Sequence, residues 1–451
     1  MGKFIRIGNG CGFWGDNLDA PVFLARDGRL HYLTLEYLAE LTMSILALQK
    51  QRDPTAGYAG DFIDVLERLA PVLHGQPNLR IITNAGGMNP QSCAAKARAI
   101  LDRHGLADRK VGIVTGDDLM PRIDDLLREG HTLTNLDTGE SLESIRPRVV
   151  SANAYLGAEP IARALGLGAS IVITGRVADA SLTVAPLVYD FGWNWNDWDR
   201  LSAATVAGHL IECGAQATGG LWCNWTEAPN LADVGYPVVN VEPTGRFVLS
   251  KAGGTGGAVN VETVSEQLLY EVGDPRRYLT PDVTADFTSV TLEQVGKDEV
   301  QVSGARGQPA SDTYKVSLAY RDGFAASGTL AIFGPNAADK ARRCGEILLE
   351  RVQRAGYRLD HSHIECVGAG SVVPRLFPAS SDALEVMLRV AVQDGRRIAV
   401  ERFAKEFAPL VTSGPPGVTG YTTGRPQVRE VFAYWPALLS KQAVHPCVDI
   451  L

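Results

Sequence analysis

Polar side chains that can move protons or bind anions follow five short apolar runs in the first 180 residues. The runs and their loops are FIRIGNGCGFWGD (4–16), RIITNAGGMNP (80–90), KVGIVTGDDL (110–119), RVVSANAYLGAEP (148–160) and SIVITGRVADA (170–180). The polar side chains in these loops are Asp16, Asn84, Asn89, Asp117, Asn153, Tyr155, Arg176 and Asp179. Carboxyl groups in such a set are candidate general acids and bases, and a guanidinium can bind a carboxylate through two hydrogen bonds.

Each of these loops opens into a helical pattern, and buried strands that alternate with helices indicate a parallel sheet with crossover helices. We expect strands near 3–8, 30–34, 79–84, 110–115, 147–152 and 169–174, and helices near 36–51, 60–73, 90–104, 117–128, 158–166 and 178–188. Ligands of such sheets bind at the carboxyl ends of the strands. The pattern therefore predicts an α/β fold in which residues 1–190 form a doubly wound, mostly parallel, Rossmann-like sheet, with all five loops facing one cleft.

Two of these loops carry candidate acid–base and anion-binding groups. Asp16 lies beside Phe13 and Trp14, whose bulk would partly desolvate its carboxyl, raise its pKa and make it a candidate general acid or base. Arg176 and Asp179 lie three residues apart near a helix start, where the arginine could bind a substrate carboxylate. The alternatives are that Asp16 caps a turn and that Arg176 and Asp179 form a local ion pair.

Two glycine-rich loops are candidate anion sites. In TNAGGMNP (83–90), Gly86 and Gly87 free the backbone amides ahead of a helix that Asn89 can cap. In KAGGTGGAVN (251–260), the residues that could bind a phosphate or a carboxylate are Lys251, Gly254, Thr255 and Gly256. The first loop is equally compatible with a tight capped turn, and the second with a hinge that lacks the Walker ending.

Other catalytic motifs are weak or absent from the sequence. No strand is followed by the dinucleotide fingerprint, and there is no G-x-S-x-G nucleophile motif. Cys213 four residues after His209 is a weak nucleophile candidate, and His361, His363 and Glu365 are a weak metal-site candidate. We therefore expect neither a metal nor a redox cofactor.

Composition describes a globular protein of 451 residues, 45% apolar and 21% charged, which favours two or three domains. We expect a tryptophan-rich junction at 191–235 and a mixed α+β domain at 236–451. The junction is predicted to hold a helix at 200–213. The second domain is predicted to hold a helix after a capping box at 263–266, antiparallel strands within 286–303, 312–321 and 328–333, helices at 340–356 and 380–394, a loop at 413–426 and a strand at 428–439.

Charge and cysteine content bear on partners and compartment. The net charge of −8 and the lack of a basic cluster argue against nucleic acid or an anionic membrane as a partner. Seven scattered cysteines without a CxxC pair, no signal peptide and no apolar run long enough to span a bilayer predict a cytoplasmic protein.

Eight motifs in order along the chain resemble the acyclic terpene utilisation protein A (AtuA) family. They are GFWGD (12–16), TNAGGMNP (83–90), SANAYLGA (151–158), ITGRVADAS (173–181), AGHLIECGAQATGG (207–220), GGTGGAVNVETVSEQLLYE (253–271), PDVTADF (281–287) and GARG (304–307). The family is named after a catabolic gene cluster for citronellol and geraniol, in which branched unsaturated acyl-CoA thioesters are carboxylated, hydrated and cleaved. Relatives also stand beside genes of the methylaspartate–mesaconate route.

The resemblance implies a hydro-lyase that acts on a branched unsaturated dicarboxylate or its CoA thioester. In this hypothesis Asp16 or Asp179 moves the proton, and Asn84 and Asn153 orient the water or the enolate oxygen. The carboxylates would be held by Arg176, Lys251 and the TNAGG amides, with Tyr155 beside them. The alternatives are a non-catalytic acyl-CoA-binding or scaffold subunit, and a C–C lyase or acyl transferase at the same cleft; a dehydrogenase is a distant third.

Partner expectations also follow from the resemblance. Longer family members continue into a small ferredoxin-like domain with an RSGDKG-type motif, whereas this sequence stops at Leu451 without it. We therefore expect a separate small ferredoxin-like subunit of about 100 residues, together with assembly of the chain into a homo-oligomer.

Overall fold

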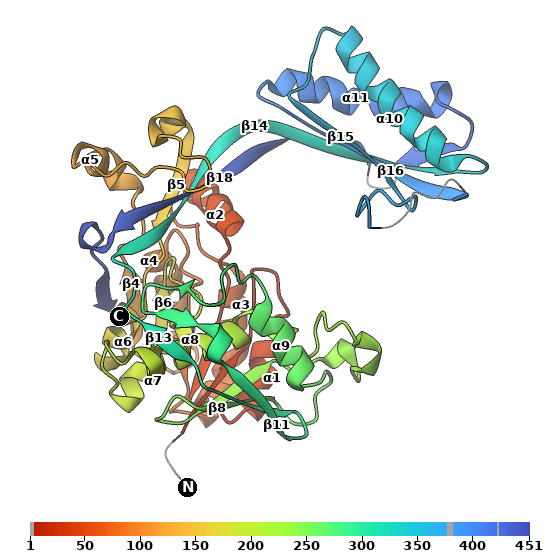
Figure 1. The fold of residues 1–451 in the computed structure, drawn as a ribbon. Helices are drawn as coiled ribbons and strands as arrows, with labels where there is room; N and C mark the ends of the chain where they lie inside the picture. Colours follow the sequence, from red (N-terminus) through yellow and green to blue (C-terminus); the bar gives the residue numbers. More distant parts are fainter. Residues whose placement is uncertain (1–3, 377–381, 422–423) are drawn as a thin grey trace. The chain divides into compact units, whose positions relative to one another are not determined.

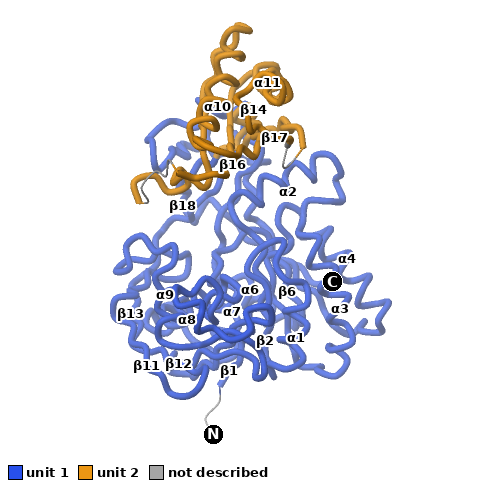
Figure 2. Tube along the Cα trace, turned by 90° about the vertical axis from the view of Figure 1, so that its right-hand side faces the viewer, with its two compact units in different colours: residues 1–319, 434–451 blue, residues 320–433 orange. Residues whose placement is uncertain are grey.

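The computed structural model describes residues 4–376, 382–421 and 424–451, which form two compact units. Unit 1 comprises residues 1–319 and 434–451, and unit 2 comprises residues 320–433 (Figure 2). Each unit is described by itself below.

Unit 1 contains most of the helices and strands of the chain. Its helices are α1 (Ala20–Asp27), α2 (Glu40–Arg52), α3 (Asp61–Gly75), α4 (Pro90–Arg103), α5 (Ile123–Arg128), α6 (Glu159–Gly166), α7 (Ser181–Phe191), α8 (Trp198–Glu212) and α9 (Val261–Leu269). Its strands are β1 (Ile5–Asn9), β2 (Tyr32–Leu35), β3 (Arg80–Thr83), β4 (Val111–Thr115), β5 (Val149–Ala154), β6 (Ile171–Thr174), β7 (Pro237–Val241), β8 (Phe247–Lys251), β9 (Tyr278–Leu279), β10 (Thr284–Asp286), β11 (Thr291–Gly296), β12 (Glu299–Ser303), β13 (Arg306–Gln308) and β19 (Cys447–Ile450).

A ten-stranded sheet with the order β11-β12-β8-β7-β1-β2-β3-β6-β4-β19 forms the centre of unit 1. The strands β1, β2, β3, β6 and β4 run parallel, and the strands on either side of them are antiparallel. Helices α1, α3 and α4 cover one face, and α6, α7 and α8 cover the other (Figure 1). The predicted doubly wound α/β fold is confirmed, and burial on both faces explains why its central strands are apolar throughout.

Strand β5 does not join this sheet, although its residues were predicted to form one of its strands. β6 pairs directly with β3 and β4, and β4 pairs with β19 at its other edge, so no position remains for β5 among the parallel strands. β5 pairs instead with β14 (Thr313–Phe333), and the backbone amide of Tyr155 donates to the Lys315 carbonyl at 2.9 Å. The loop after β5, one of the five strand-end loops predicted from the sequence, therefore does not follow a strand of this sheet.

The compact units divide the chain at other positions than the domains expected at 1–190, 191–235 and 236–451. β7 pairs with β1 from Ile5 opposite Val241 onward, and β8, β12 and β11 extend the same sheet. Trp193, in the expected junction, donates its indole N–H to the Pro243 carbonyl at 3.1 Å. Unit 1 therefore continues to residue 319, because antiparallel strands from the second half of the chain complete the sheet of the first half.

Unit 2 is built on a sheet with the order β15-β16-β14-β17. It contains β15 (His361–Val367), β16 (Glu385–Asp394), β17 (Val418–Tyr421), α10 (Ala337–Arg354) and α11 (Arg397–Ser413), while β14 and β18 (Arg429–Ser440) each extend into both units. The two helices pack on one another and on this sheet. β17 lies within the segment that was predicted to be a loop, and residues 422–423 of that segment lie outside the described residues.

The helix predicted over residues 380–394 is wrong, because residues 385–394 form strand β16. Its buried side chains are Val386, Leu388, Val390 and Val392, which alternate with more exposed ones. This period of two places one face of the strand against α10 and α11 and is the pattern of a half-buried strand. Residues 380–381 lie outside the described residues.

The helix expected after residues 263–266 begins three residues earlier than the predicted capping box. Asn260 caps α9, since its side-chain oxygen accepts from the Thr263 amide at 2.9 Å and the Thr263 hydroxyl accepts from the Asn260 amide at 3.1 Å. The capping box is therefore Asn260 with Thr263, in place of Thr263 with Glu266.

Helices α7 and α8 approach closely at Gly208, and this contact generates a stability prediction. A Cβ at Gly208 would lie 2.7 Å from the Ala180 Cα and 2.8 Å from its carbonyl oxygen. Gly208→Ala should therefore lower the free energy of unfolding by about 1–3 kcal/mol. Chemical denaturation measures this loss. Gly75→Ala is the matched helical control because a Cβ there meets nothing within 4 Å, and an equal loss in both variants would contradict the close approach.

Candidate active site: a carboxyl-rich cleft

A cavity of about 870 Å³ lies in unit 1 at the carboxyl ends of the parallel strands. Its side chains come from the loops after β1, β2, β5 and β6, from the end of α8 and the segment that follows it, from the residue before β7, from the segment between α9 and β10 and from the start of β14. The polar and ionisable ones are Asp16, Glu36, Glu40, Tyr155, Arg176, Asp179, His209, Glu212, Cys213, Gln216, Tyr236, Tyr270, Glu271, Tyr278, Thr280 and Lys315. Its position at the strand ends agrees with the location that the sequence predicted.

Four of the predicted site residues line this cleft: Asp16, Tyr155, Arg176 and Asp179. Asp16 is half-buried, and its carboxylate accepts from the Gly12 amide at 2.8 Å, from the Asn17 amide at 2.7 Å and from the Tyr236 hydroxyl. Those hydrogen bonds fix the conformation of the loop after β1, so Asp16 acts as a turn cap at the edge of the cleft.

Arg176 is the central cation of the cleft, and its guanidinium binds groups of the protein itself. Its side chain is 2% exposed; Nη1 donates to the Leu38 carbonyl at 2.7 Å, and Nη2 donates to Asp179 Oδ1 at 2.6 Å. Nη1 also lies 3.8 Å from Glu36 Oε1, and the guanidinium carbon lies 4.0 Å from the centre of the Tyr155 ring. This geometry matches the local Arg–Asp pair, and it leaves the fork of Arg176 poorly placed to bind a substrate carboxylate.

Three carboxyl groups of the cleft have raised pKa values. Burial raises the pKa of Glu36 well above its usual range, with a further increase from the charge of Asp179. Burial also raises the pKa of Asp179, against the lowering effect of Arg176. For Glu212, burial outweighs the hydrogen bond to His209 and raises the pKa to about 7. These carboxyls hold their protons at a higher pH than an exposed carboxyl does.

Glu40 is the opposite case, because its pKa is lowered. Burial alone would raise it, but the hydrogen bond from the Tyr155 hydroxyl and the charge of Lys315 lower it to about 2. The hydroxyl lies 2.7 Å from Glu40 Oε1, and Lys315 Nζ lies 3.1 Å from the same oxygen. One cleft thus holds a carboxylate whose pKa is lowered together with carboxyls whose pKa values are raised, a combination typical of acid–base sites.

Asn84 and Asn153, which were predicted to orient water or an enolate, are buried and do not line the cavity. Asn84 donates to Glu36 Oε1 and accepts from the Tyr37 amide at 2.8 Å. Asn153 donates to Asp117 Oδ2 at 2.9 Å. Both side chains therefore lie behind the surface of the cleft.

Asp117, another residue of the predicted strand-end set, also lies behind this surface. Its Oδ2 accepts from the backbone amide of Arg176 at 2.9 Å. Burial raises the pKa of Asp117 to about 6, although these hydrogen bonds act in the other direction. Asn84 therefore fixes a residue of the cleft, and Asn153 with Asp117 fixes the loop that carries Arg176.

The TNAGGMNP loop is a tight capped turn in this structure. A Cβ at Gly86 would lie 2.5 Å from the Thr174 carbonyl oxygen, and one at Gly87, whose φ is +50°, would lie 2.4 Å from a methyl group of Leu46. Asn89 accepts from the Ser92 amide at 3.3 Å and caps α4. The glycines of this loop serve close packing, and neither they nor Asn89 line the cleft.

The glycine-rich loop at 251–260 also lies outside the cleft. Lys251 Nζ donates to the Thr255 carbonyl at 2.9 Å and lies 3.3 Å from Asp298 Oδ2. Gly254 and Thr255 line a different hollow, of about 530 Å³, together with Asp19, Asp27 and Asp233 and one basic residue, Arg26, which pairs with Asp27. A Cβ at Gly256 would meet the Asn230 carbonyl oxygen. The acidic side chains of that hollow disfavour the phosphate or carboxylate that the sequence predicted there.

The sequence analysis did not select Glu36, Glu40, Glu212 or Lys315. Glu36 directly follows the apolar run 32–35 and fits the strand-end rule, but it was assigned to a helix expected from residue 36; that helix, α2, begins at Glu40. Glu212 lies within a motif already noted for His209 and Cys213. Lys315 had no local signal, because only the pairing of β14 with β5 brings it to the cleft.

The predicted weak sites lack the geometry that they would need. Burial raises the pKa of Cys213 to about 12, which leaves its thiol protonated. His361, His363 and Glu365 share strand β15, where Glu365 forms ion pairs with Arg389 and His363. Within the described ranges, no group of three or more His, Cys, Asp or Glu side chains is arranged to hold a metal ion.

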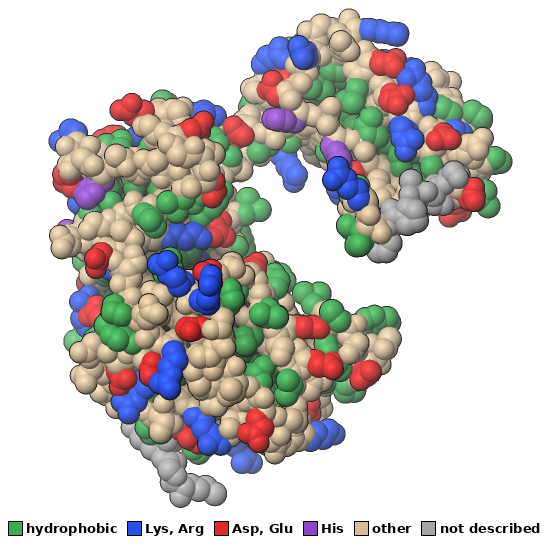
Figure 3. Space-filling model, in the orientation of Figure 1, with side chains coloured by type: hydrophobic (Ala, Val, Ile, Leu, Met, Phe, Trp, Pro, Cys, Tyr) green, Lys and Arg blue, Asp and Glu red, His purple; other side chains and the backbone are tan. Residues whose placement is uncertain are grey.

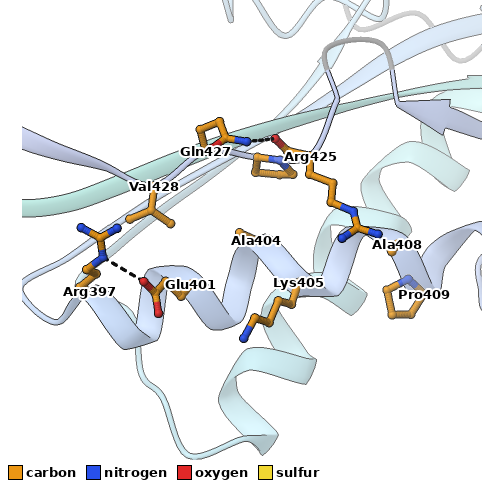
Figure 4. Close-up of a pocket in the computed structure, with 10 residues that line it drawn as sticks. Arg397, Glu401, Ala404, Lys405, Ala408, Pro409, Arg425, Gln427 and Val428 are labelled. Carbon is orange, nitrogen blue, oxygen red and sulfur yellow. Dashed lines mark hydrogen bonds and ion pairs between the residues drawn. The ribbon is translucent and has the colours of Figure 1, made fainter.

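A second hollow, of about 720 Å³, lies in unit 2 along α11, where its basic side chains do not converge. Arg397 Nε donates to Glu401 Oε1 at 2.9 Å. Figure 4 shows this pair, with Lys405 and Arg425 pointing in different directions. On the face shown in Figure 3, acidic and basic side chains are interspersed, with no extended basic area. The cleft of unit 1 is therefore the stronger candidate site.

The ion pair in the cleft generates a prediction for Arg176→Met. The variant leaves Asp179 and Glu36 buried without their cation, so we expect a loss of about 3–5 kcal/mol in the free energy of unfolding at neutral pH. The change also raises the folded-state pKa values of these carboxyls further. Folded protein then binds protons that the unfolded chain has already lost, so stability falls as pH rises.

Denaturation at pH 5 and pH 8 tests this expectation, with the larger loss expected at pH 8. Arg397→Met, which removes the exposed pair with Glu401 and the contact with the Phe324 ring in unit 2, is the control and should lower the free energy of unfolding by about 1 kcal/mol or less at both pH values. A loss that is equal at both pH values would show that Arg176 acts through packing alone.

Comparisons with known proteins agree with the motifs in the sequence. No curated protein and no solved structure matches the chain. Among the described residues, no helix combines the length and the apolar character needed to cross a membrane. The family model described as acyclic terpene utilisation family protein AtuA matches residues 5–450, and the chain therefore belongs to this family.

Proposed function

We propose that the protein is a catabolic hydro-lyase that adds or removes water at the double bond of a branched unsaturated dicarboxylate or its CoA thioester. The observation that carries the proposal is the separation of carboxyl groups within one cleft. Glu36 and Asp179 have raised pKa values, whereas the pKa of Glu40 is about 2. Buried groups with shifted pKa values in a cleft are typical of sites that transfer protons.

Hydration of a double bond needs an acid, a base and a group that holds the substrate. The base takes a proton from water while the oxygen bonds to one carbon, and the acid gives a proton to the neighbouring carbon. Asp179 is the best placed acid, because 35% of its side chain is exposed and Arg176 fixes one of its oxygens. Glu36, whose side chain is only 5% exposed, lies 3.8 Å from the Arg176 guanidinium that holds Asp179.

Lys315 is the group best placed to hold a substrate carboxylate. Its side chain is 45% exposed, its ammonium lies 4.7 Å from the centre of the Tyr155 ring, and its bond to Glu40 leaves further donors available. Burial would lower its pKa, but Tyr434 and Glu40 raise it, so Lys315 stays charged. It takes the role that the sequence analysis assigned to Arg176 and Lys251.

The charge of the cleft is compatible with an anionic substrate if its carboxyls hold protons. Asp179, Glu36 and Glu212 would repel a dicarboxylate if all three were ionised. Burial raises the pKa values of all three carboxyls, to about 7 for Glu212, and so favours their neutral forms and lowers this repulsion. Membership in the AtuA family supports a branched carbon skeleton as the substrate class.

Removal of the proposed acid tests the reaction. Asp179→Asn should lower kcat about 10²–10⁴-fold while the protein stays folded, because the amide cannot donate the same proton, and Glu36→Gln should lower kcat by a smaller factor, because Glu36 acts on the substrate only through its neighbours. The assay follows the double-bond absorbance with mesaconate, citramalate and branched unsaturated acyl-CoA esters. Glu129→Gln, at an exposed position after α5, is the control. Full turnover in both variants would refute the hydro-lyase, and ligand binding without any turnover in the unaltered protein would favour a binding subunit.

Removal of the proposed carboxylate anchor separates binding from chemistry. Lys315→Met should raise KM about tenfold or more with a smaller change in kcat, because the ammonium contacts a part of the substrate that does not react. Lys405→Met in the hollow of unit 2 is the control. If Lys405→Met raises KM and Lys315→Met does not, the substrate binds in unit 2 and the cleft assignment is wrong.

A further inference from the structure

His209 and Glu212 form a buried pair on the last turn of α8, at the wall of the cleft. Their spacing of three residues places both side chains on one face of the helix. His209 Nδ1 lies 3.1 Å from Glu212 Oε1, and the side chains are 2% and 12% exposed. Both residues line the cavity, and Glu212 also shares a small void with Glu36 and Asp179.

The second bond of His209 determines where the protons of the pair can lie. Nε2 is 2.9 Å from the Gln267 backbone carbonyl, which can only accept a hydrogen bond. Nε2 must therefore carry a hydrogen, and in the neutral ring Nδ1 is then a bare lone pair. That lone pair faces Glu212 Oε1, so the bond between them exists only when one further proton lies there.

The neighbours of His209 and Glu212 favour the binding of this additional proton. The charges of Asp179 and Glu271 raise the pKa of Glu212, and the rings of Tyr278 and Phe287 lie 5.5 Å and 5.3 Å from the His209 ring. Glu212 Oε2 is covered and has no hydrogen-bond partner among the described residues, so an ionised carboxylate there is poorly solvated. Cys213, the remaining titratable neighbour, stays a neutral thiol.

These neighbours also set the pH at which the pair takes up its proton. Burial lowers the pKa of His209, but the hydrogen bond and the charge of Glu212 outweigh it and raise the value above the ordinary one. Burial raises the pKa of Glu212 to about 7. A proton acceptor that titrates near neutral pH is well matched to general base catalysis.

We infer that His209 and Glu212 together accept a single proton and that Glu212 is the general base of the cleft, opposite the acid Asp179. The role as base rests on the proposed hydro-lyase function; the uptake of one shared proton does not. In the hydration direction the proton leaves water, whose oxygen keeps the bonding electrons and attacks the carbon. That proton comes to lie between Glu212 Oε1 and His209 Nδ1, while Asp179 gives a proton to the neighbouring carbon. In dehydration the two transfers are reversed.

His209 is a positioning residue in this scheme, because it acts on the substrate only through Glu212. The Gln267 carbonyl fixes its ring tautomer, and the Gln267 side-chain amide donates in return to the His209 carbonyl at 2.9 Å. These two bonds link α8 to α9 and hold the imidazole in one orientation. The acceptor site is thus preformed by contacts that do not involve the substrate.

Nitrogen NMR of the full chain with labelled histidine tests the shared proton without any substrate. The His209 signals are identified by their loss in His209→Gln. We expect the ring to titrate above the ordinary pKa of histidine with Nε2 protonated throughout, and Glu212→Gln to lower the His209 midpoint by about one pH unit or more. An unchanged midpoint in Glu212→Gln would overturn the inference, whatever the activity.

Kinetics test the role as base. A base must be unprotonated, so kcat/KM should rise with pH through about 7, the value for Glu212; His209→Gln, which removes the bond that lowers this pKa, should shift this limb to higher pH, and Glu212→Gln should remove the limb and lower kcat about 10²-fold or more. Formate should partly restore turnover to Glu212→Ala but not to Asp179→Ala in the hydration direction. Glu129→Gln is again the control.

The outcomes separate this inference from the proposed function. If Asp179→Asn abolishes turnover while Glu212→Gln retains it, the hydro-lyase stands and Glu212 is not its base. If neither change affects turnover, the hydro-lyase itself fails, and the NMR titration still decides whether the pair shares a proton.

Discussion

The ion pair between Arg176 and Asp179 is the interaction on which the rest of the cleft depends. A guanidinium that is 2% exposed needs carboxylates and carbonyls around it, and it finds Asp179, Glu36 and the Leu38 carbonyl. These groups follow β6 and β2, so the same contacts that satisfy the charge also join two strand ends. The Tyr155 ring against the guanidinium adds the loop after β5. The cation thus holds the cleft together and permits several carboxyls to lie close to one another.

The carboxyl groups that lie close together in the cleft differ in their pKa values. Glu40 near the mouth receives two hydrogen bonds from Tyr155 and Lys315 and stays ionised, whereas the loss of solvation raises the pKa values of Glu36 and Glu212 deeper in the wall. Burial of these carboxyls costs free energy. The core of unit 1, a ten-stranded sheet with helices on both of its faces, offsets that cost. Rigid supports of this kind keep acids and bases at fixed distances, which proton transfer requires.

Local patterns in the sequence predicted the architecture of unit 1 better than that of unit 2. Apolar runs followed by capped helices identify parallel strands, because burial on both faces removes polar residues from them. The same approach failed at residues 385–394, where alternation with a period of two was overlooked, and at β5, whose partner is 160 residues away in the sequence. Strand order depends on which edges remain unpaired, and no local pattern contains that information.

The sequence by itself determined the fold class, the family and four residues of the cleft, because the carboxyl ends of parallel strands must meet at one edge of a sheet. Only the tertiary structure decided that Asn84, Gly86 and Lys251 serve packing or support and that Glu36, Glu212 and Lys315 complete the site. Both an anion-binding loop and a tight turn use glycine or asparagine at a strand end, so the residue type alone does not distinguish these two roles. Lys315 reaches the cleft through the pairing of β14 with β5. Burial raises the pKa values of Glu36, Asp179 and Glu212, and this burial exists only in the folded chain.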